Sequence, residues 1–318
     1  MMSAADDQLL PVVRISDLPQ QRQAQRWLVE QLWGDSSVGV IGGAPKCSKT
    51  WLGLDLALSV ATGTACLGTF AVPHPGAVLV YLAEDALPIV RERVAGMARH
   101  RGLALAAVAI HVITAPTLRL DREPHRSRLF ETVRRLRPRL LLLDPLVRLH
   151  ALDENHAGEV AGLLAYFRSL QRQLDLSVML VHHTRKNAAP AAAAGQALRG
   201  SGDIHAFGDS NLYLRRSREH LLLASEHRAA PAPPPVALQL VATDPSQTHL
   251  EVIAPLHEPP RRSLHDQVLD LLAPGVVLTR ARLRDTLGIK NQRLGEALES
   301  LERAGRICRT PTGWRRPD

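Results

Sequence analysis

The stretch VGVIGGAPKCSKT, residues 38–50, decides how the rest of this sequence is interpreted. A short apolar run over 38–41 precedes a turn that contains Gly and Pro, and an amphipathic helical pattern follows over 50–61. Strand, turn, Lys-Thr and helix is the order of a phosphate-binding loop, whose sequence pattern is G-x-x-x-x-G-K-[ST]. The departure from this pattern is Ser48, which stands at the position of the second glycine.

This loop predicts a site for ATP. Backbone N–H groups and the start of the helix would meet the phosphates, and Lys49 would neutralise the β and γ oxygens. The Thr50 hydroxyl would ligate Mg²⁺. The alternative is a Gly/Pro turn that precedes a Lys-Thr pair by chance. The residues expected to contact the nucleotide are Gly43, Ala44, Pro45, Lys46, Cys47, Ser48, Lys49, Thr50 and Trp51.

Outward from the loop, short apolar runs alternate with helical patterns. Strands are expected at 38–41, 77–82, 110–113, 140–143 and 177–181, and helices at 50–61, 89–100, 126–135 and 160–173. This alternation predicts an α/β fold whose mainly parallel sheet has helices on both faces. Ligands of such folds lie at the carboxyl ends of the strands. A further helix is expected near 21–32.

The second half of the chain has a different pattern. An Ala- and Gly-rich loop is expected over 186–202, and four antiparallel strands at 211–214, 221–224, 236–241 and 250–253. The tail has helical runs at 264–272, 279–287 and 291–304 and a hairpin at 306–316, which is the order of a winged helix-turn-helix. The predicted organisation is therefore an N-terminal segment, 1–35, a P-loop α/β core, 36–256, and a winged-helix-like domain, 263–318.

Two carboxylates follow predicted strands beside the loop. Leu140–Leu143 runs directly into Asp144, an arrangement typical of the Walker B strand that delivers an Asp to the Mg²⁺ shell. The strand at 77–82 is followed by Glu84, which could act as general base toward the attacking water. The alternatives are an Asp that caps the next turn and an acidic turn or helix N-cap before Pro88.

The strand at 177–181 ends in His182 and His183. Because strand side chains alternate, one imidazole could face the γ-phosphate as a sensor of hydrolysis. The alternative is a pair of hydrogen-bonded strand-end histidines. Adjacent histidines on a strand make a poor chelate, so a metal pair is disfavoured.

Composition restricts the class of protein. The chain has 318 residues, 45% of them hydrophobic, and a net charge of +8. Residues 261–318 hold twelve basic and seven acidic side chains, so much of this charge lies in the tail. Three widely spaced cysteines, the lack of a signal-peptide pattern and apolar runs too short to span a bilayer predict a cytoplasmic protein with no membrane partner.

The residues above form a series that resembles the RepA-type ATPases. These are RecA-fold hexameric replicative helicases of broad-host-range plasmids, with relatives in mobile elements, and the resemblance covers residues 38–253. The matching motifs are Gly43-Ala44-Pro45-Lys46, Lys49-Thr50-Trp51-Leu52, Ala83-Glu84-Asp85, Leu143-Asp144-Pro145-Leu146 with Arg148, His182-His183, and Leu198-Arg199-Gly200-Ser201.

The resemblance implies roles for single residues. Glu84 would be the catalytic glutamate, Asp144 the Walker B aspartate and His183 the phosphate sensor. Arg228 stands where related hexamers place an arginine finger, and Arg215 and Arg216 are rivals for that role.

The resemblance also implies where DNA would bind. The loops at 148–159 and 184–202 would line the pore of a homohexamer around single-stranded DNA, through Arg148, Arg185, Lys186 and Arg199. In the tail, Lys290, Arg293, Arg306 and Arg309 would contact duplex DNA. The alternatives are solvated side chains in the loops and, because Glu296, Glu299 and Glu302 share the last helix, a protein-contact module in the tail.

The resulting expectation is a MgATP-hydrolysing ring helicase of a plasmid or mobile element. Two alternatives remain open. One is a DNA-binding regulatory ATPase that switches a complex without unwinding, and the other is a DNA-binding adaptor that has lost hydrolysis.

Overall fold

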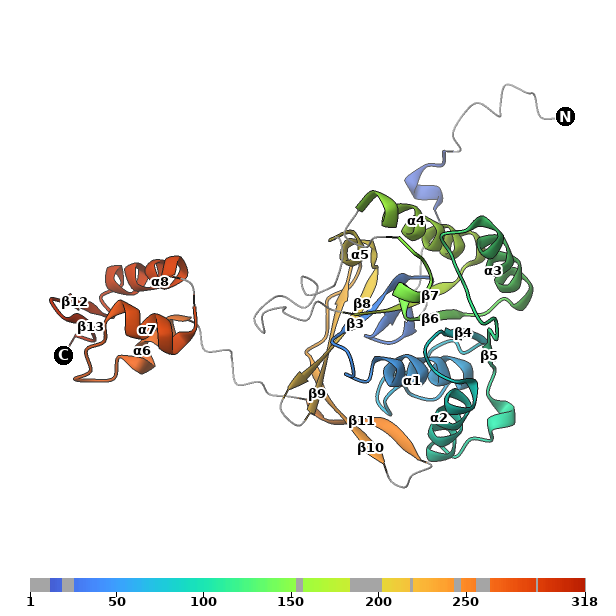
Figure 1. Ribbon diagram of the computed structural model, residues 1–318, viewed down its shortest axis with the longest axis horizontal. Coiled ribbons are helices and arrows are strands. Elements are labelled where there is room, and N and C mark those ends of the chain that lie inside the picture. Colours follow the sequence, from blue (N-terminus) through green and yellow to red (C-terminus); the bar gives the residue numbers. More distant parts are fainter. Residues whose placement is uncertain are drawn as a thin grey trace. The chain divides into compact units, whose positions relative to one another are not determined.

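The chain divides into two compact units, Met1–Pro255 and Leu256–Asp318. The computed structural model describes residues 12–18, 26–152, 157–183, 202–217, 220–242, 247–255, 264–289 and 291–317 (Figure 1). The first unit holds the phosphate-binding loop predicted from the sequence.

Within the described residues, a nine-stranded sheet forms the centre of the first unit. The six strands from β8 to β5 run parallel, and β9, β10 and β11 continue the sheet in antiparallel pairing. The predicted α/β fold with a mainly parallel sheet is confirmed. In spatial order the strands are β11 (Thr248–Pro255), β10 (Val236–Ala242), β9 (His220–His227), β8 (Ser210–Ser217), β3 (Val38–Gly43), β7 (Ser177–His183), β6 (Leu140–Asp144), β4 (Val78–Leu82) and β5 (Ile110–Val112).

Helices cover both faces of this sheet (Figure 1). One face carries α1 (Lys49–Thr62) and α2 (Leu87–His100), and the other carries α3 (Glu123–Leu136), α4 (Ala157–Leu174) and α5 (Gly202–Phe207). The central strand β6 shows how the sequence achieves this. Its alternate leucines pack into separate clusters, Leu140 and Leu142 on the α1 side and Leu141 and Leu143 on the α4 side. No helix in the described ranges is both long and apolar enough to cross a membrane.

The helix expected near 21–32 is wrong over its described part. Residues 27–34 form a hairpin of β1 (Trp27–Val29) and β2 (Trp33–Gly34), with Gln31 in a left-handed turn conformation. Leu28 and Trp33 are fully buried in the cluster that includes α1. The free energy gained by burying these side chains against α1 therefore outweighs the weak local preference for a helix that their spacing indicates.

Strand β8 joins the two parts of the sheet. The strand expected at 211–214 pairs antiparallel with β9, as predicted, and on its other side it runs parallel to β3, with Ile41 opposite Leu212. Parallel neighbours need a crossover that returns the chain to the same end of the sheet. Helix α5, which falls at the end of the predicted loop and just after it, leads into β8 from one face of the sheet.

The second unit has three helices followed by a hairpin, in the order expected from the tail. Its buried side chains come from all three helices and include Val268, Leu283 and Leu298. The Thr279 hydroxyl accepts a hydrogen bond from the backbone N–H of Arg282 at 3.2 Å, so Thr279 is the N-cap that the sequence predicts. The elements are α6 (Leu264–Leu271), α7 (Arg280–Leu287), α8 (Asn291–Arg303), β12 (Cys308–Thr310) and β13 (Gly313–Arg315).

Candidate active site

The carboxyl ends of β3, β4, β6 and β7 meet at one edge of the sheet and bring the predicted residues together. Strand register places Gly43 opposite His183, and Leu82 opposite Asp144. A pocket of about 310 Å³ lies at this edge. It is lined by Lys46, Cys47, Ser48, Lys49, Thr50, Trp51, Leu82, Glu84, Asp85, Arg93, Asp144 and His183.

The loop between β3 and α1 is shaped by close backbone packing and by two left-handed residues. A Cβ on Gly43 would lie 2.5 Å from the carbonyl oxygen of Leu214 on β8, so this position requires glycine. Lys46 and Ser48 have φ angles of 61° and 64°, a region that residues with a side chain rarely adopt. Ser48 therefore takes the conformation for which the usual pattern supplies a glycine.

Replacing Ser48 with glycine should raise the free energy of unfolding by about 0.5–1 kcal/mol, because a left-handed conformation strains a side-chain-bearing residue but not glycine. Urea unfolding of the nucleotide-free protein measures this. Ser169→Gly, within helix α4, is the matched control and should lower the same quantity. A Ser48→Gly protein no more stable than the wild type would contradict strain at this position.

Lys49 is buried at the base of the pocket, with 5% of the residue exposed. Its Nζ donates to the carbonyl oxygen of Ala44 at 2.8 Å and lies 3.9 Å from Cys47 Sγ. Burial lowers the pKa of Lys49, and the nearby Asp144 and Glu84 charges oppose this shift. Because a buried ammonium has lost most of its hydration, an anionic phosphate is a strongly favourable partner for it.

Thr50 and Asp144 meet across the loop. The Thr50 hydroxyl donates to Asp144 Oδ2 at 2.6 Å, although the two residues are 94 positions apart. Burial raises the pKa of Asp144 to about 6, against the opposing effects of the Thr50 hydrogen bond and the Lys49 charge. A hydroxyl and a carboxylate at the start of a helix are oxygen donors of the type that Mg²⁺ takes together with phosphates and water. The donor set therefore fits the Mg²⁺ of a bound MgATP.

Two carboxylates follow β4, and each is paired with an arginine. Glu84 Oε1 accepts from Arg148 Nε at 2.8 Å, and Asp85 Oδ2 accepts from Arg93 Nη1 at 2.7 Å. The Arg93 guanidinium also lies over the Trp51 ring, 5.2 Å from its centroid. Sequence reasoning missed Arg93, because its contacts depend on how α2 packs beside α1 and no local motif signals them.

The two histidines at the end of β7 have different surroundings. His182 is almost fully buried, whereas His183 is partly exposed and lines the pocket. Alternation along the strand places His183 on the same side as Met179 and Val181, which pack in the cluster with α1, and His182 on the opposite side, as the sequence predicts. His183 therefore stands at the position expected of a phosphate sensor, and that role stays a prediction.

Two of the arginine-finger candidates, Arg228 and Arg216, lie near opposite ends of the strands. Arg228 follows β9 at the amino ends of the parallel strands, where its side chain donates to the carbonyl oxygen of Ala206 at 2.7 Å and lies 3.6 Å from Asp209. Arg216 lies near the far end of β8 and donates to the carbonyl oxygen of Lys46 at 3.3 Å. Within one chain, Arg216 is therefore beside the phosphate-binding loop and Arg228 is remote from it.

The predicted DNA-contacting residues are distributed over both units. Arg148 ends the short 3₁₀ helix η5 (Leu146–Arg148) and borders the pocket through Glu84. In the second unit, Arg293, Arg306 and Arg309 are exposed, and Arg309 lies 6.0 Å from the centroid of the Trp314 ring. The other four, Arg185, Lys186, Arg199 and Lys290, lie outside the described residues.

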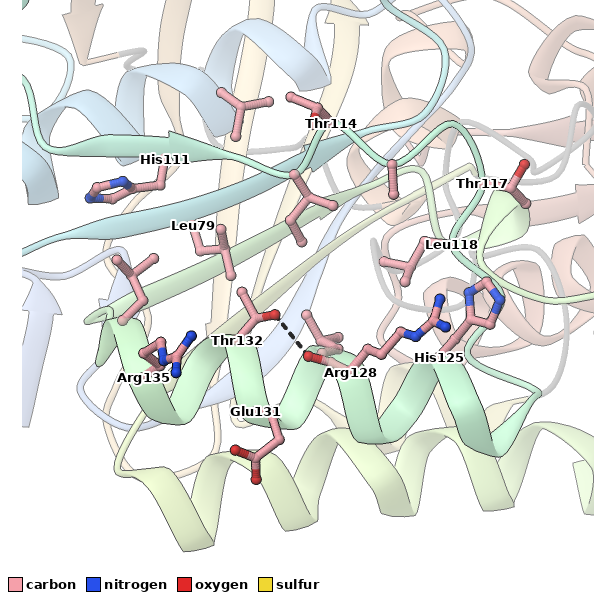
Figure 2. A pocket seen from close by; sticks show the side chains of 15 residues that line it. Leu79, His111, Thr114, Thr117, Leu118, His125, Arg128, Glu131, Thr132 and Arg135 are labelled. Atoms are coloured by element: carbon pink, nitrogen blue, oxygen red, sulfur yellow. Dashed lines mark hydrogen bonds between the residues drawn. The ribbon is translucent and has the colours of Figure 1, made fainter.

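A larger pocket, of about 810 Å³, lies between β5 and α3. Figure 2 shows Leu79 and His111 on the strands, and Arg128, Thr132 and Arg135 on the helix below them. No candidate site residue in the described ranges lines this pocket. By volume alone the larger pocket would be the preferred candidate for an active site. The smaller pocket, however, contains several titratable side chains with shifted pKa values, and such groups are more typical of an active site.

Comparisons with known proteins identify the family and the fold of this chain. The sequence pattern of the family AAA_25, described as an AAA domain, matches residues 4–189, more than half of the chain. The fold is similar to the crystal structure of the RadB recombinase, with a TM-score of 0.50 and 16% sequence identity over 69% of this chain and 92% of that chain. This likeness confirms the predicted RecA-like fold.

Proposed function

This chain belongs to the AAA_25 family of AAA domains, and from that premise we propose that it hydrolyses MgATP and acts on DNA as a ring-forming helicase. The observation that carries the proposal is the Thr50–Asp144 contact, which lies beside the buried Lys49 and within a pocket that Glu84 and His183 also line. Each of these side chains comes from a different strand end or from the start of α1, so the fold itself assembles the group.

The proposed roles follow from the chemistry of the groups. Lys49 and the loop N–H groups bind the phosphates, Thr50 and Asp144 hold the Mg²⁺ of the substrate, and Glu84 accepts the proton of the attacking water. The bound Mg²⁺ supplies charge stabilisation at the phosphates. His183, opposite Gly43, reports the state of the γ-phosphate toward the segment at 184–202. An arginine of a neighbouring copy, Arg228 or its rivals, completes the site in the ring.

Three observations support DNA as the partner. The net charge is +8, the exposed Arg148 contacts a pocket residue, and the structurally similar RadB protein is a recombinase. Single-stranded DNA in the pore of a hexamer and duplex DNA at a winged-helix-like tail are the finer parts of the proposal. In the tail, the exposed Glu296, Glu299 and Glu302 disfavour a phosphate contact along most of α8, so the duplex is assigned to Arg293 and the hairpin.

A regulatory ATPase that switches a DNA complex without unwinding it is the second candidate. The observation in its favour is that Glu84 and Asp85 both form ion pairs with arginine in this structure, which is consistent with slow basal turnover. The proposal of a helicase of a plasmid or mobile element rests on the resemblance of the motif series.

Strand separation distinguishes the two candidates. A forked duplex with a fluorophore and a quencher on its two strands should separate in the presence of the full chain and MgATP, and remain paired with Lys49→Ala. ATP hydrolysis without separation would overturn the helicase and favour the switch. Separation that persists in Lys49→Ala would exclude ATP-driven unwinding.

A further inference from the structure

Arg148 and Glu84 form an ion pair between a proposed DNA contact and the proposed general base. Arg148 Nε donates to Glu84 Oε1 at 2.8 Å, and the two side chains are 62% and 48% exposed. Glu84 lines the nucleotide pocket, whereas Arg148 lies outside its lining. The pair therefore joins the pocket to the outer surface of the protein.

The backbone on the Arg148 side of the pair is firmly held. Leu146 and Leu149, on either side of Arg148, are fully buried, and the Arg148 N–H donates to the carbonyl oxygen of Pro145 at 3.1 Å. The carbonyl oxygen of Leu149 also accepts from the N–H of Leu120 at 2.6 Å. Since the backbone is fixed, the part of Arg148 that can change partner is its long exposed side chain.

The chemistry of the pair opposes catalysis by Glu84. A carboxylate activates water by accepting its proton, and here Oε1 already accepts a hydrogen bond from a cation. An exposed ion pair is weak, so a competing anion can replace it readily. A guanidinium binds phosphate through two parallel hydrogen bonds, which makes a nucleic-acid backbone a strong competitor.

The neighbouring pair does not share these properties. Asp85 and Arg93 are each 24% exposed, and Arg93 is also packed over the Trp51 ring. A polyphosphate chain at the surface reaches Arg148 much more easily than Arg93. Of the two carboxylates, Glu84 is therefore the one whose arginine partner can be drawn away by a phosphate at the protein surface.

We propose that Arg148 is a positioning residue that holds Glu84 away from the attacking water until a nucleic-acid phosphate takes the guanidinium. Nucleic acid then stimulates hydrolysis by freeing the base, without a movement of the backbone. This inference rests on the proposed function, because it requires Glu84 to be the general base.

Steady-state ATP hydrolysis by Arg148→Ala, with and without a single-stranded oligonucleotide, tests the proposal. Basal kcat should rise about two- to fivefold, the range that loss of an exposed ion pair allows, and KM for ATP should stay unchanged. Stimulation by DNA should fall to near onefold even at saturating oligonucleotide. Arg134→Ala is the matched control, since the Arg134–Glu131 pair on α3 is similarly exposed, at 61% and 59%, and lies outside the site; its basal and stimulated rates should equal those of the wild type.

Two other results would overturn the inference. If Arg148 only binds DNA, basal kcat stays at the wild-type value and full stimulation returns at higher oligonucleotide concentration. If Arg148 orients Glu84 productively, basal kcat falls. Added salt gives an independent readout, because it weakens exposed pairs and should raise basal kcat of the wild type relative to Arg148→Ala. Absence of any Lys49-dependent hydrolysis in the wild type would instead overturn the proposed function.

Discussion

Glu84→Gln should leave ATP binding intact and lower kcat by about 100- to 10,000-fold, the range that general-base catalysis supplies. Glutamine is nearly isosteric with glutamate, so the pocket beside Thr50 and Asp144 keeps its shape. An amide cannot accept the proton of water, so only the chemical step is lost. Binding of a fluorescent ATP analogue and steady-state phosphate release measure the two quantities separately.

Asp85→Asn is the matched control, because the two carboxylates are adjacent and both line the pocket. Asp85 is paired with Arg93, which also lies over the Trp51 ring, so loss of the Asp85 charge should reduce kcat much less than loss of the Glu84 charge. Retained turnover in Glu84→Gln together with lost turnover in Asp85→Asn would transfer the role of base to Asp85.

Asp144→Asn should inactivate the enzyme and stabilise the nucleotide-free fold. Asparagine is a weaker Mg²⁺ ligand than aspartate, and weaker placement of the metal charge at the reacting phosphates lowers kcat by about 100-fold or more. Burial raises the pKa of Asp144 from 3.8 to about 6, which corresponds to about 3 kcal/mol. The folded protein therefore binds this proton more tightly than the unfolded chain does, and stability falls as the pH rises from about 4 to 6. Asparagine removes this loss.

Urea unfolding at pH 7.5 and pH 4 tests the second effect. The free energy of unfolding of Asp144→Asn should exceed that of the wild type by about 2–3 kcal/mol at pH 7.5. At pH 4, where the carboxyl of the wild type is protonated, the two free energies should differ little. Asp55→Asn is the contrasting control, because Asp55 is buried in an ion pair with Arg101 at 2.6 Å and accepts from the N–H of Leu67. Its neutralisation should destabilise the fold. A destabilised Asp144→Asn protein would contradict the assigned cost of the buried charge.

Features that depend on local sequence were predictable. The Gly43–Thr50 loop, the four leucines of β6 and the cap at Thr279 each carry their signal within a few residues. The alternation of strands and helices then determined the α/β fold, and with it the meeting of the strand ends. The gathering of Asp144 and His183 at one pocket was predictable as well, since both directly end buried strands.

Features that depend on tertiary packing were not predictable in the same way. The hairpin at 27–34 forms because Leu28 and Trp33 bury themselves against α1, and the direction of β8 depends on its crossover through α5. The ion pairs of Glu84 and Asp85 join residues 64 and 8 positions apart. No spacing rule connects such residues, because their contact exists only after the sheet and its helices have assembled.

The central claim is that the pocket at the end of β3 hydrolyses MgATP in response to DNA. Steady-state MgATP hydrolysis by the full chain, with and without single-stranded DNA and beside Lys49→Ala, tests it most directly. The account predicts turnover that rises several-fold with DNA and disappears when the buried ammonium of Lys49 is removed. Turnover that is indifferent to DNA, or that survives in Lys49→Ala, would contradict it.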